Sequence, residues 1–181
     1  MRKAKRFRLL ICHGLLLAGC ASTEATEPYD IVAIGASNTE GRGRGQQNDG
    51  VSLDQAYPAQ LERLLQSEGC HVRVLNAGRA GETMAETLTR LPGVVGKGTK
   101  VVILDTATND WYWGGGSTAA NIERIQHAVA ERGAKTVILE ADIWRDVWVS
   151  YPNGFHFSAE GYASVAAYLA PKVRAAGICS N

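Results

Sequence analysis

The sequence predicts an α/β fold: one domain built on a parallel β-sheet of four to five strands, with helices on both faces. Short apolar runs alternate with longer segments of helical periodicity, and no internal repeat interrupts this order. The 181 residues are 45% hydrophobic and 20% charged, a balance that suits one domain with a sizeable core. The apolar runs also end in polar loops. In open parallel sheets such loops share one edge, where ligands bind.

Residues 1–19 are expected to be a secretory signal and not part of the domain. Five basic residues and no acidic one open the chain, and the apolar stretch over 9–18 is too short to span a membrane. The stretch ends in Leu17-Ala18-Gly19-Cys20, which resembles the lipobox of bacterial lipoproteins. An ordinary signal peptide with a chance cysteine is the alternative.

The lipobox resemblance implies cleavage before Cys20 and lipidation of that residue. Ala21 at the next position resembles sorting to the outer membrane, so we expect a protein anchored on the periplasmic side of that membrane. Residues 20–28 would then be a polar tether, and residues 29–181 the domain.

Loss of the signal would change the charge and the cysteine content of the chain. It leaves 14 basic against 18 acidic residues, a formal net charge of −4, which argues against a nucleic-acid partner. Cys12 would leave with the signal and Cys20 would carry lipid. Cys70 and Cys179 would remain in an oxidising compartment, where a disulfide can persist, but the sequence leaves open whether the two meet.

The first half of the domain is expected to contain two strands and two helices. A β-branched run, Ile31-Val32-Ala33-Ile34, predicts a strand over 30–35 that ends at Gly35, and a glycine-rich loop follows. Apolar residues on one face predict a helix over 53–66, with Gly69 past its end. Residues 72–75 read as the second strand. A loop over 76–81 then leads to a helix over 82–91, closed by Pro92-Gly93.

The second half repeats this alternation. The most uniformly apolar run predicts a strand over 100–105, and a long loop over 106–116 follows it. A helix is expected over 118–132, capped by Gly133, and a fourth strand over 135–140. Residues 141–157 are irregular and aromatic, with room for a short fifth strand. The last helix, over 158–176, has Ser158 as its N-cap.

Polar residues at the ends of these strands form a candidate hydrolase site. Hydrolysis of an acyl bond needs a nucleophile, a base and donors aimed at the developing oxyanion. Ser37 follows the first strand as the candidate nucleophile, and His156 precedes the last helix as the candidate base. The backbone N–H of Gly81, at the start of a helix, and the side-chain amide of Asn109 are candidate oxyanion donors.

At these residues the chain resembles the SGNH hydrolases, also called the GDSL esterase/lipase family. Four sequence blocks carry the resemblance, in the order of the family: Gly35-Ala36-Ser37-Asn38-Thr39, Asn76-Ala77-Gly78-Arg79-Ala80-Gly81, Thr108-Asn109-Asp110 and Asn153-Gly154-Phe155-His156. The resemblance implies a flavodoxin-like three-layer α/β/α sandwich and an esterase that needs no cofactor. It also implies a small acyl-ester, lipid or acetylated-glycan substrate. Neither a metal-ligand spacing nor the ending of a phosphate-binding P-loop is present in the sequence.

Three residues depart from the pattern of the family. Ala36 stands where the first block has Asp, and Thr108 stands where the third block has Gly. Asn153 replaces the Asp that orients the histidine, so it lacks the negative charge that stabilises imidazolium. In serine proteases the corresponding change costs about 10⁴ in kcat. The possibilities are a weaker triad, a Ser–His dyad held by a backbone carbonyl, or a substitute carboxylate from Asp142 or Asp146.

Alternative functions therefore stay open at this stage. A scaffold retired from catalysis could bind a lipid or glycan in an aromatic cleft, which Asn153 favours. A phosphate or flavin binder would use the loop after the first strand but leaves Asn109 and His156 unexplained. Two groups of aromatic residues, over 111–113 and 144–157, could either line a substrate pocket or pack loops together.

Overall fold

A computed structural model describes residues 29–42, 50–114, 116–140, 143 and 156–179. Its sheet has four parallel strands in the order β2-β1-β3-β4. The strands are β1 (Ile31–Gly35), β2 (Val74–Gly78), β3 (Val101–Asp105) and β4 (Lys135–Leu139). The helices are α1 (Ser37–Glu40), α2 (Tyr57–Ser67), α3 (Met84–Val94), α4 (Asp110–Trp113), α5 (Thr118–Ala130) and α7 (Ala159–Ala175).

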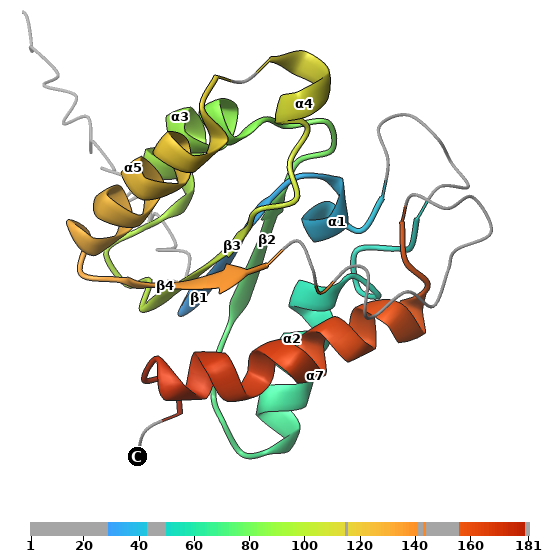
Figure 1. Cartoon of the computed structure of the whole chain (residues 1–181). Coiled ribbons are helices and arrows are strands. Elements are labelled where there is room, and N and C mark those ends of the chain that lie inside the picture. Colours follow the sequence, from blue (N-terminus) through green and yellow to red (C-terminus); the bar gives the residue numbers. More distant parts are fainter. Residues whose placement is uncertain (1–28, 43–49, 115, 141–142, 144–155, 180–181) are drawn as a thin grey trace, which may run out of the picture.

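The sheet is the middle of three layers, as the sequence predicts. Figure 1 shows α2 and α7 on one face of the sheet and α3 and α5 on the other. Alternate residues of β1 point to opposite faces, so Ile31 packs with α2 and α7 while Val32 packs with α3 and α5. Every residue of β1 and β3 is buried, which explains why both strands are apolar up to their last residues, Gly35 and Asp105. The predicted fold class is confirmed.

Two helices differ from the sequence prediction at their ends. Helix α2 begins at Tyr57 and not at residue 53, because Pro58 occupies the first turn and Ala56 before it is extended. Helix α3 continues through Pro92, which was expected to close it. The proline lies in the last turn, where the missing N–H costs one hydrogen bond, and the helix ends two residues later at Val94.

Two further segments differ in kind or register. The second strand covers 74–78 and not 72–75, because its polar residues pair with β1 up to Gly35 and Gly78. Four residues of the predicted loop over 106–116 form α4, which starts after Asn109 and ends at Gly114 in the left-handed conformation, with φ +68°. A fifth strand within 141–157 would lie almost entirely outside the described residues.

At the amino edge of the sheet, Cys70 and Cys179 form a disulfide, with their Cα atoms 5.3 Å apart. It joins the segment before β2 to the residues after α7, a separation of 109 positions. The pairing that the sequence left open is therefore present in the structure. Ser158 caps α7 as predicted, since its side chain accepts a hydrogen bond from the N–H of Gly161.

Candidate active site

Ser37 is delivered to the carboxyl edge of the sheet by β1, which runs into a tight turn and then α1. The backbone carbonyl of Ser37 accepts hydrogen bonds from the N–H groups of Gly41 and Arg42, at 2.7 and 3.1 Å. The side chain of Ser37 is half-buried, whereas Ala36 before it is 1% exposed. The residue that replaces the first-block Asp is thus packed in the interior, while the serine lies at the surface of the edge.

A buried polar network supports this turn from below. Asp105, at the end of β3, is 0% exposed and accepts a hydrogen bond from the Thr39 hydroxyl at 2.9 Å. Its other carboxylate oxygen accepts from the N–H of Ala107, also at 2.9 Å. The hydroxyl of Tyr57, on α2, lies 3.3 Å from that of Thr39. The network joins β3, α1 and α2 beneath the turn that carries Ser37.

Burial and the nearby Asp105 carboxylate raise the pKa of Tyr57 well above its ordinary value near 10. The phenol therefore stays protonated and acts as a neutral partner in the network. Gly35 leaves the space that the network needs, since a Cβ there would lie 2.6 Å from both the Asp105 Cβ and the Thr39 hydroxyl oxygen.

The second block is fixed directly against α1. The Glu40 carboxylate accepts a hydrogen bond from the N–H of Ala80 at 2.6 Å, and the N–H of Arg79 donates to the Gly35 carbonyl at 3.0 Å. A Cβ on Gly78 would lie 2.1 Å from the backbone nitrogen of Glu40, so only glycine allows this approach. Gly81, three residues after Gly78, has φ +80°. The block of the expected oxyanion donor is thereby tied to the helix of the expected nucleophile.

Asn109 is hydrogen-bonded to Glu82, the residue that directly follows Gly81. Its side-chain Nδ2 and its backbone N–H both donate to the carbonyl oxygen of Glu82, at 3.1 and 3.2 Å. Because the amide has two N–H bonds, one stays available to a ligand. The second and third sequence blocks therefore meet at one carbonyl group.

Further bonds hold this junction rigid. The Glu82 carboxylate, 2% exposed, accepts from Arg90 Nε at 2.7 Å and from the Thr87 hydroxyl at 3.0 Å. Asp110 accepts from the N–H of Met84 at 3.1 Å and from the Thr108 hydroxyl. The threonine that replaces the third-block glycine thus engages its own loop through its hydroxyl.

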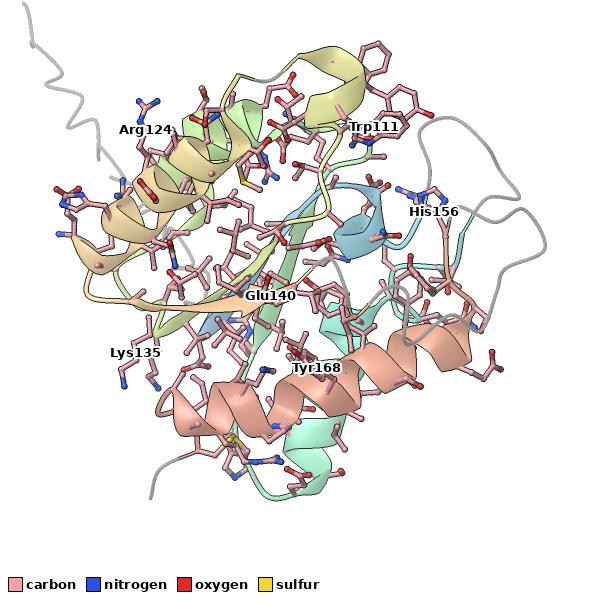
Figure 2. The ribbon with its side chains drawn as sticks, viewed as in Figure 1. Trp111, Arg124, Lys135, Glu140, His156 and Tyr168 are labelled. Atoms are coloured by element: carbon pink, nitrogen blue, oxygen red, sulfur yellow. A yellow bond between two sulfur atoms is a disulfide. The ribbon has the colours of Figure 1, made fainter. Side chains whose placement is uncertain are left out.

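His156 is 8% exposed and lies just before the N-cap of α7. Figure 2 shows it on the same side of the molecule as α1, beyond the carboxyl ends of the strands. Asn153, Asp142 and Asp146 lie outside the described residues, so the partner that orients the imidazole stays a prediction. Cys20 and the lipobox lie outside them as well.

The aromatic residues that follow Asn109 form an exposed group on α4. The side chains of Trp111, Tyr112 and Trp113 are 77%, 59% and 69% exposed. Ring centroids are 3.6 Å apart between the first two and 6.3 Å apart between the last two. They do not pack α4 onto the core. Whether they line a substrate pocket or pack loops together stays a prediction, because residues 144–155 lie outside the described residues.

Sequence reasoning missed the supporting residues of the site. Asp105, Thr39 and Tyr57 form one buried network, although they are 18 and 66 positions apart. A weak signal existed, because Asp105 is a lone charged residue at the end of the most uniformly apolar run. Among the described residues no group of three or more His, Cys, Asp or Glu could hold a metal ion. No helix in that part of the chain is long and apolar enough to cross a bilayer.

Comparison with known proteins identifies the family. The profile of the GDSL-like Lipase/Acylhydrolase family matches residues 33–153, more than half of the chain. The chain therefore belongs to this family, as the sequence blocks imply. It is also 26% identical over 160 residues to Esterase TesA of Pseudomonas aeruginosa, a match that spans 84% of this chain and 75% of TesA.

Solved structures support the same fold. A protein described as lipolytic and of the G-D-S-L family, from Desulfitobacterium hafniense DCB-2, superposes with a TM-score of 0.59 at 15% identity. The alignment covers 78% of this chain and 97% of that one. The psychrotrophic esterase EstA from Pseudoalteromonas sp., in a structure inhibited by monoethylphosphonate, gives a TM-score of 0.50 at 16% identity, with coverages of 81% and 74%.

Proposed function

We propose that the chain is a serine esterase that hydrolyses a carboxylic ester or thioester, with Ser37 as nucleophile and His156 as base. The observation that carries this proposal is that the side-chain amide and the backbone N–H of Asn109 both donate to the Glu82 carbonyl. These two bonds hold one candidate oxyanion donor beside Gly81. Both donors belong to the same sheet edge as Ser37. Membership of the GDSL-like lipase/acylhydrolase family and the similarity to Esterase TesA support the reaction class.

In the proposed mechanism, the Ser37 hydroxyl attacks the ester carbonyl while His156 accepts its proton. The backbone N–H groups of Ser37 and Gly81 and the amide of Asn109 donate to the developing oxyanion. His156 then protonates the leaving group, and the acyl group stays on Ser37. Water, deprotonated by His156, attacks the acyl-enzyme and releases the acid. None of these steps requires a cofactor.

A fluorophosphonate probe followed by mass mapping tests the nucleophile. We expect label on Ser37, and a loss of at least about 10³ in the hydrolysis of p-nitrophenyl esters by Ser37→Ala. Ser164→Ala is the matched control, since this serine is exposed on α7 and donates to the Glu160 carbonyl. Label on another residue, or a Ser37→Ala variant that keeps most of the rate, would mean that the nucleophile lies elsewhere.

The orienting partner of His156 is tested separately. A carboxylate would stabilise the imidazolium that forms during attack, so Asn153→Asp should raise kcat by about one to three powers of ten. If Asp142 or Asp146 already supplies that charge, Asn153→Asp has little effect, and alanine at the true partner removes most of the rate. A rate that none of the three variants changes means that no side-chain carboxylate orients His156, which leaves the dyad or the non-catalytic scaffold.

A second function is a lipid- or glycan-binding scaffold without hydrolytic activity, which the replacement of the triad Asp by Asn153 favours. Absence of fluorophosphonate label on any serine, together with saturable binding of a lipid or an acetylated glycan, would favour this function over the esterase.

We also propose that the mature chain is anchored by a lipidated Cys20 on the periplasmic side of the outer membrane. The support is the basic start and the sequence Leu17-Ala18-Gly19-Cys20. Cys20→Ser should release or mislocalise the protein. Unchanged membrane attachment of this variant would contradict the anchor without touching the esterase proposal.

A further inference from the structure

The helix α4 presents a group of aromatic side chains that the hydrolytic mechanism does not use. Trp111, Tyr112 and Trp113 are 77%, 59% and 69% exposed. Leu53, at 51%, is the other large apolar side chain with comparable exposure in the part of the chain that the structure describes. Three of these four exposed apolar side chains are thus consecutive residues of one short helix.

The exposure of these rings is built into the fold. Asn109 accepts hydrogen bonds from the N–H groups of Tyr112 and Trp113, at 2.9 and 3.0 Å, and also donates to Glu82. The Asp110 carboxylate accepts a hydrogen bond from the N–H of Met84, at the start of α3. Helix α4 is therefore held at both Glu82 and α3, and its rings point away from the core while touching one another.

We propose that α4 docks the domain onto the surface of a lipid bilayer, with the three rings at the level of the headgroups. Tryptophan and tyrosine combine a large apolar surface with an N–H or O–H group, and they favour the boundary between water and lipid for this reason. Because Asn109 directly precedes α4, the same contact would place the candidate active site beside the membrane.

The size and shape of the surface favour a bilayer over other partners. Three aromatic side chains offer at most about 750 Å², which is below the roughly 800 Å² that each partner contributes to an ordinary stable protein interface. Small molecules bind in concave sites. Two hollows formed by described residues, of about 320 and 370 Å³, are lined by other segments, around Arg79 and around Cys70.

The tether joins the domain just before β1, at the amino edge of the sheet, so its length limits how far the domain can move from the bilayer but does not itself select α4 as the contact. Tyr29, the first described residue, lies nine positions after Cys20, a stretch that spans at most about 30 Å when extended. An anchored chain would thus keep the domain within reach of the bilayer. The presence of the domain at a membrane rests on the proposed Cys20 anchor, whereas contact of α4 with lipid can be measured by itself.

The test measures contact between α4 and lipid by tryptophan fluorescence. The chain has four tryptophans, so Trp144→Phe with Trp148→Phe leaves Trp111 and Trp113 as reporters. The full chain is reconstituted in phosphatidylcholine vesicles whose acyl chains carry bromine, a quencher confined to the bilayer. We expect a loss of fluorescence against unbrominated vesicles, because tryptophans at the headgroup level lie beside the bilayer, with little quenching by aqueous iodide.

A matched reporter lies elsewhere on the surface. Leu53→Trp in a chain with all four native tryptophans changed to Phe should be quenched by iodide and not by brominated lipid. Equal lipid quenching of both reporters, or no lipid quenching of the α4 reporter, would overturn the proposal. So would α4 fluorescence that stays water-like in vesicles but shifts with a soluble ester, because α4 would then bind substrate. Release of Cys20→Ser from membranes is scored independently, so failure of the anchor and failure of α4 docking are distinguishable.

Discussion

The two edges of the sheet are held together by different kinds of interaction. At the carboxyl edge, Asp105, Glu82 and Thr39 are buried polar residues whose bonds join segments far apart in the sequence. At the amino edge, distant segments are joined by the Cys70–Cys179 disulfide and by an exposed ion pair between Lys100 and Asp30.

The difference indicates a division of roles. Buried polar networks fix atoms in one arrangement, and they leave unsatisfied groups if any member is lost. A disulfide mainly restricts the unfolded chain and tolerates variation nearby. We therefore expect changes at the amino edge to alter stability alone, and changes at the carboxyl edge to alter stability and hydrolysis together.

Removal of the disulfide should have the largest effect on stability. For a loop of this length, 109 positions, the chain-entropy estimate is about 4–5 kcal/mol, and strain or residual structure lowers it. Cys70→Ser with Cys179→Ser should reduce the free energy of unfolding in urea by about that amount. Hydrolysis measured well below the Tm should stay unchanged, because the site lies at the opposite edge. A matching fall in kcat would contradict the separation of the two edges.

Substitution at Gly78 should cause the next largest loss of stability. An added Cβ meets the backbone of Glu40 at 2.1 Å, and backbone cannot rotate away as a side chain can. Gly78→Ala should cost about 3 kcal/mol of unfolding free energy and should lower kcat by displacing α1.

Gly93→Ala on α3 is the control for Gly78→Ala, because its Cβ would meet no atom within 4 Å. Alanine is the better helix former, so this variant should change stability by less than about 1 kcal/mol. Equal unfolding curves for the two variants would show that α1 yields to the added methyl group.

The Thr39–Asp105 pair should give an intermediate effect. Thr39→Val removes the hydroxyl and leaves a buried carboxylate oxygen without that donor, which costs about 1–3 kcal/mol. Asp105→Asn keeps the shape but alters the charge. In a double-mutant cycle we expect a coupling of about 0.5–3 kcal/mol, with kcat falling more than KM rises.

Thr39→Ser keeps the hydroxyl of the network and should restore most of the rate that Thr39→Val loses. A purely structural role for Thr39 would instead lower stability and leave kcat unchanged at temperatures where the variants are folded. Urea unfolding and steady-state kinetics on the same preparations separate the two outcomes.

The sequence predicted the layers and the placement of Ser37 because both follow from local patterns. Apolar runs identify buried strands, and a glycine after β1 indicates the turn. It misplaced β2, since Asn76 and Gly78 are loop residues by composition and enter the strand only through pairing with β1. The four residues of α4, three of them aromatic, show no helical periodicity in the sequence, so the sequence did not predict this helix. The partners of Asp105 come from other elements, and no pattern within one segment reveals them.

Tyr57→Phe should have the smallest effect at neutral pH, and its effect should depend on pH. The hydroxyl lies 3.3 Å from that of Thr39, so its loss should cost about 0.5–1.5 kcal/mol at pH 7. Burial and the Asp105 carboxylate raise the pKa of Tyr57 well above 10 in the folded chain. Above pH 10 the unfolded chain therefore releases a proton that the folded chain keeps, and stability falls as pH rises.

The stabilisation that the raised pKa of Tyr57 gives is fully present below pH 10 and is lost as the pH rises above 10. Phenylalanine has no ionisable group and cannot provide it. The free energy of unfolding of Tyr57→Phe should accordingly decline less steeply than that of the wild type between pH 10 and 11, so the gap between the two proteins narrows. Urea unfolding at intervals from pH 7 to 11 measures that gap. Parallel curves over the whole range would mean that the phenol ionises equally in both states, so that neither burial nor the Asp105 carboxylate raises the pKa of Tyr57 in the folded chain.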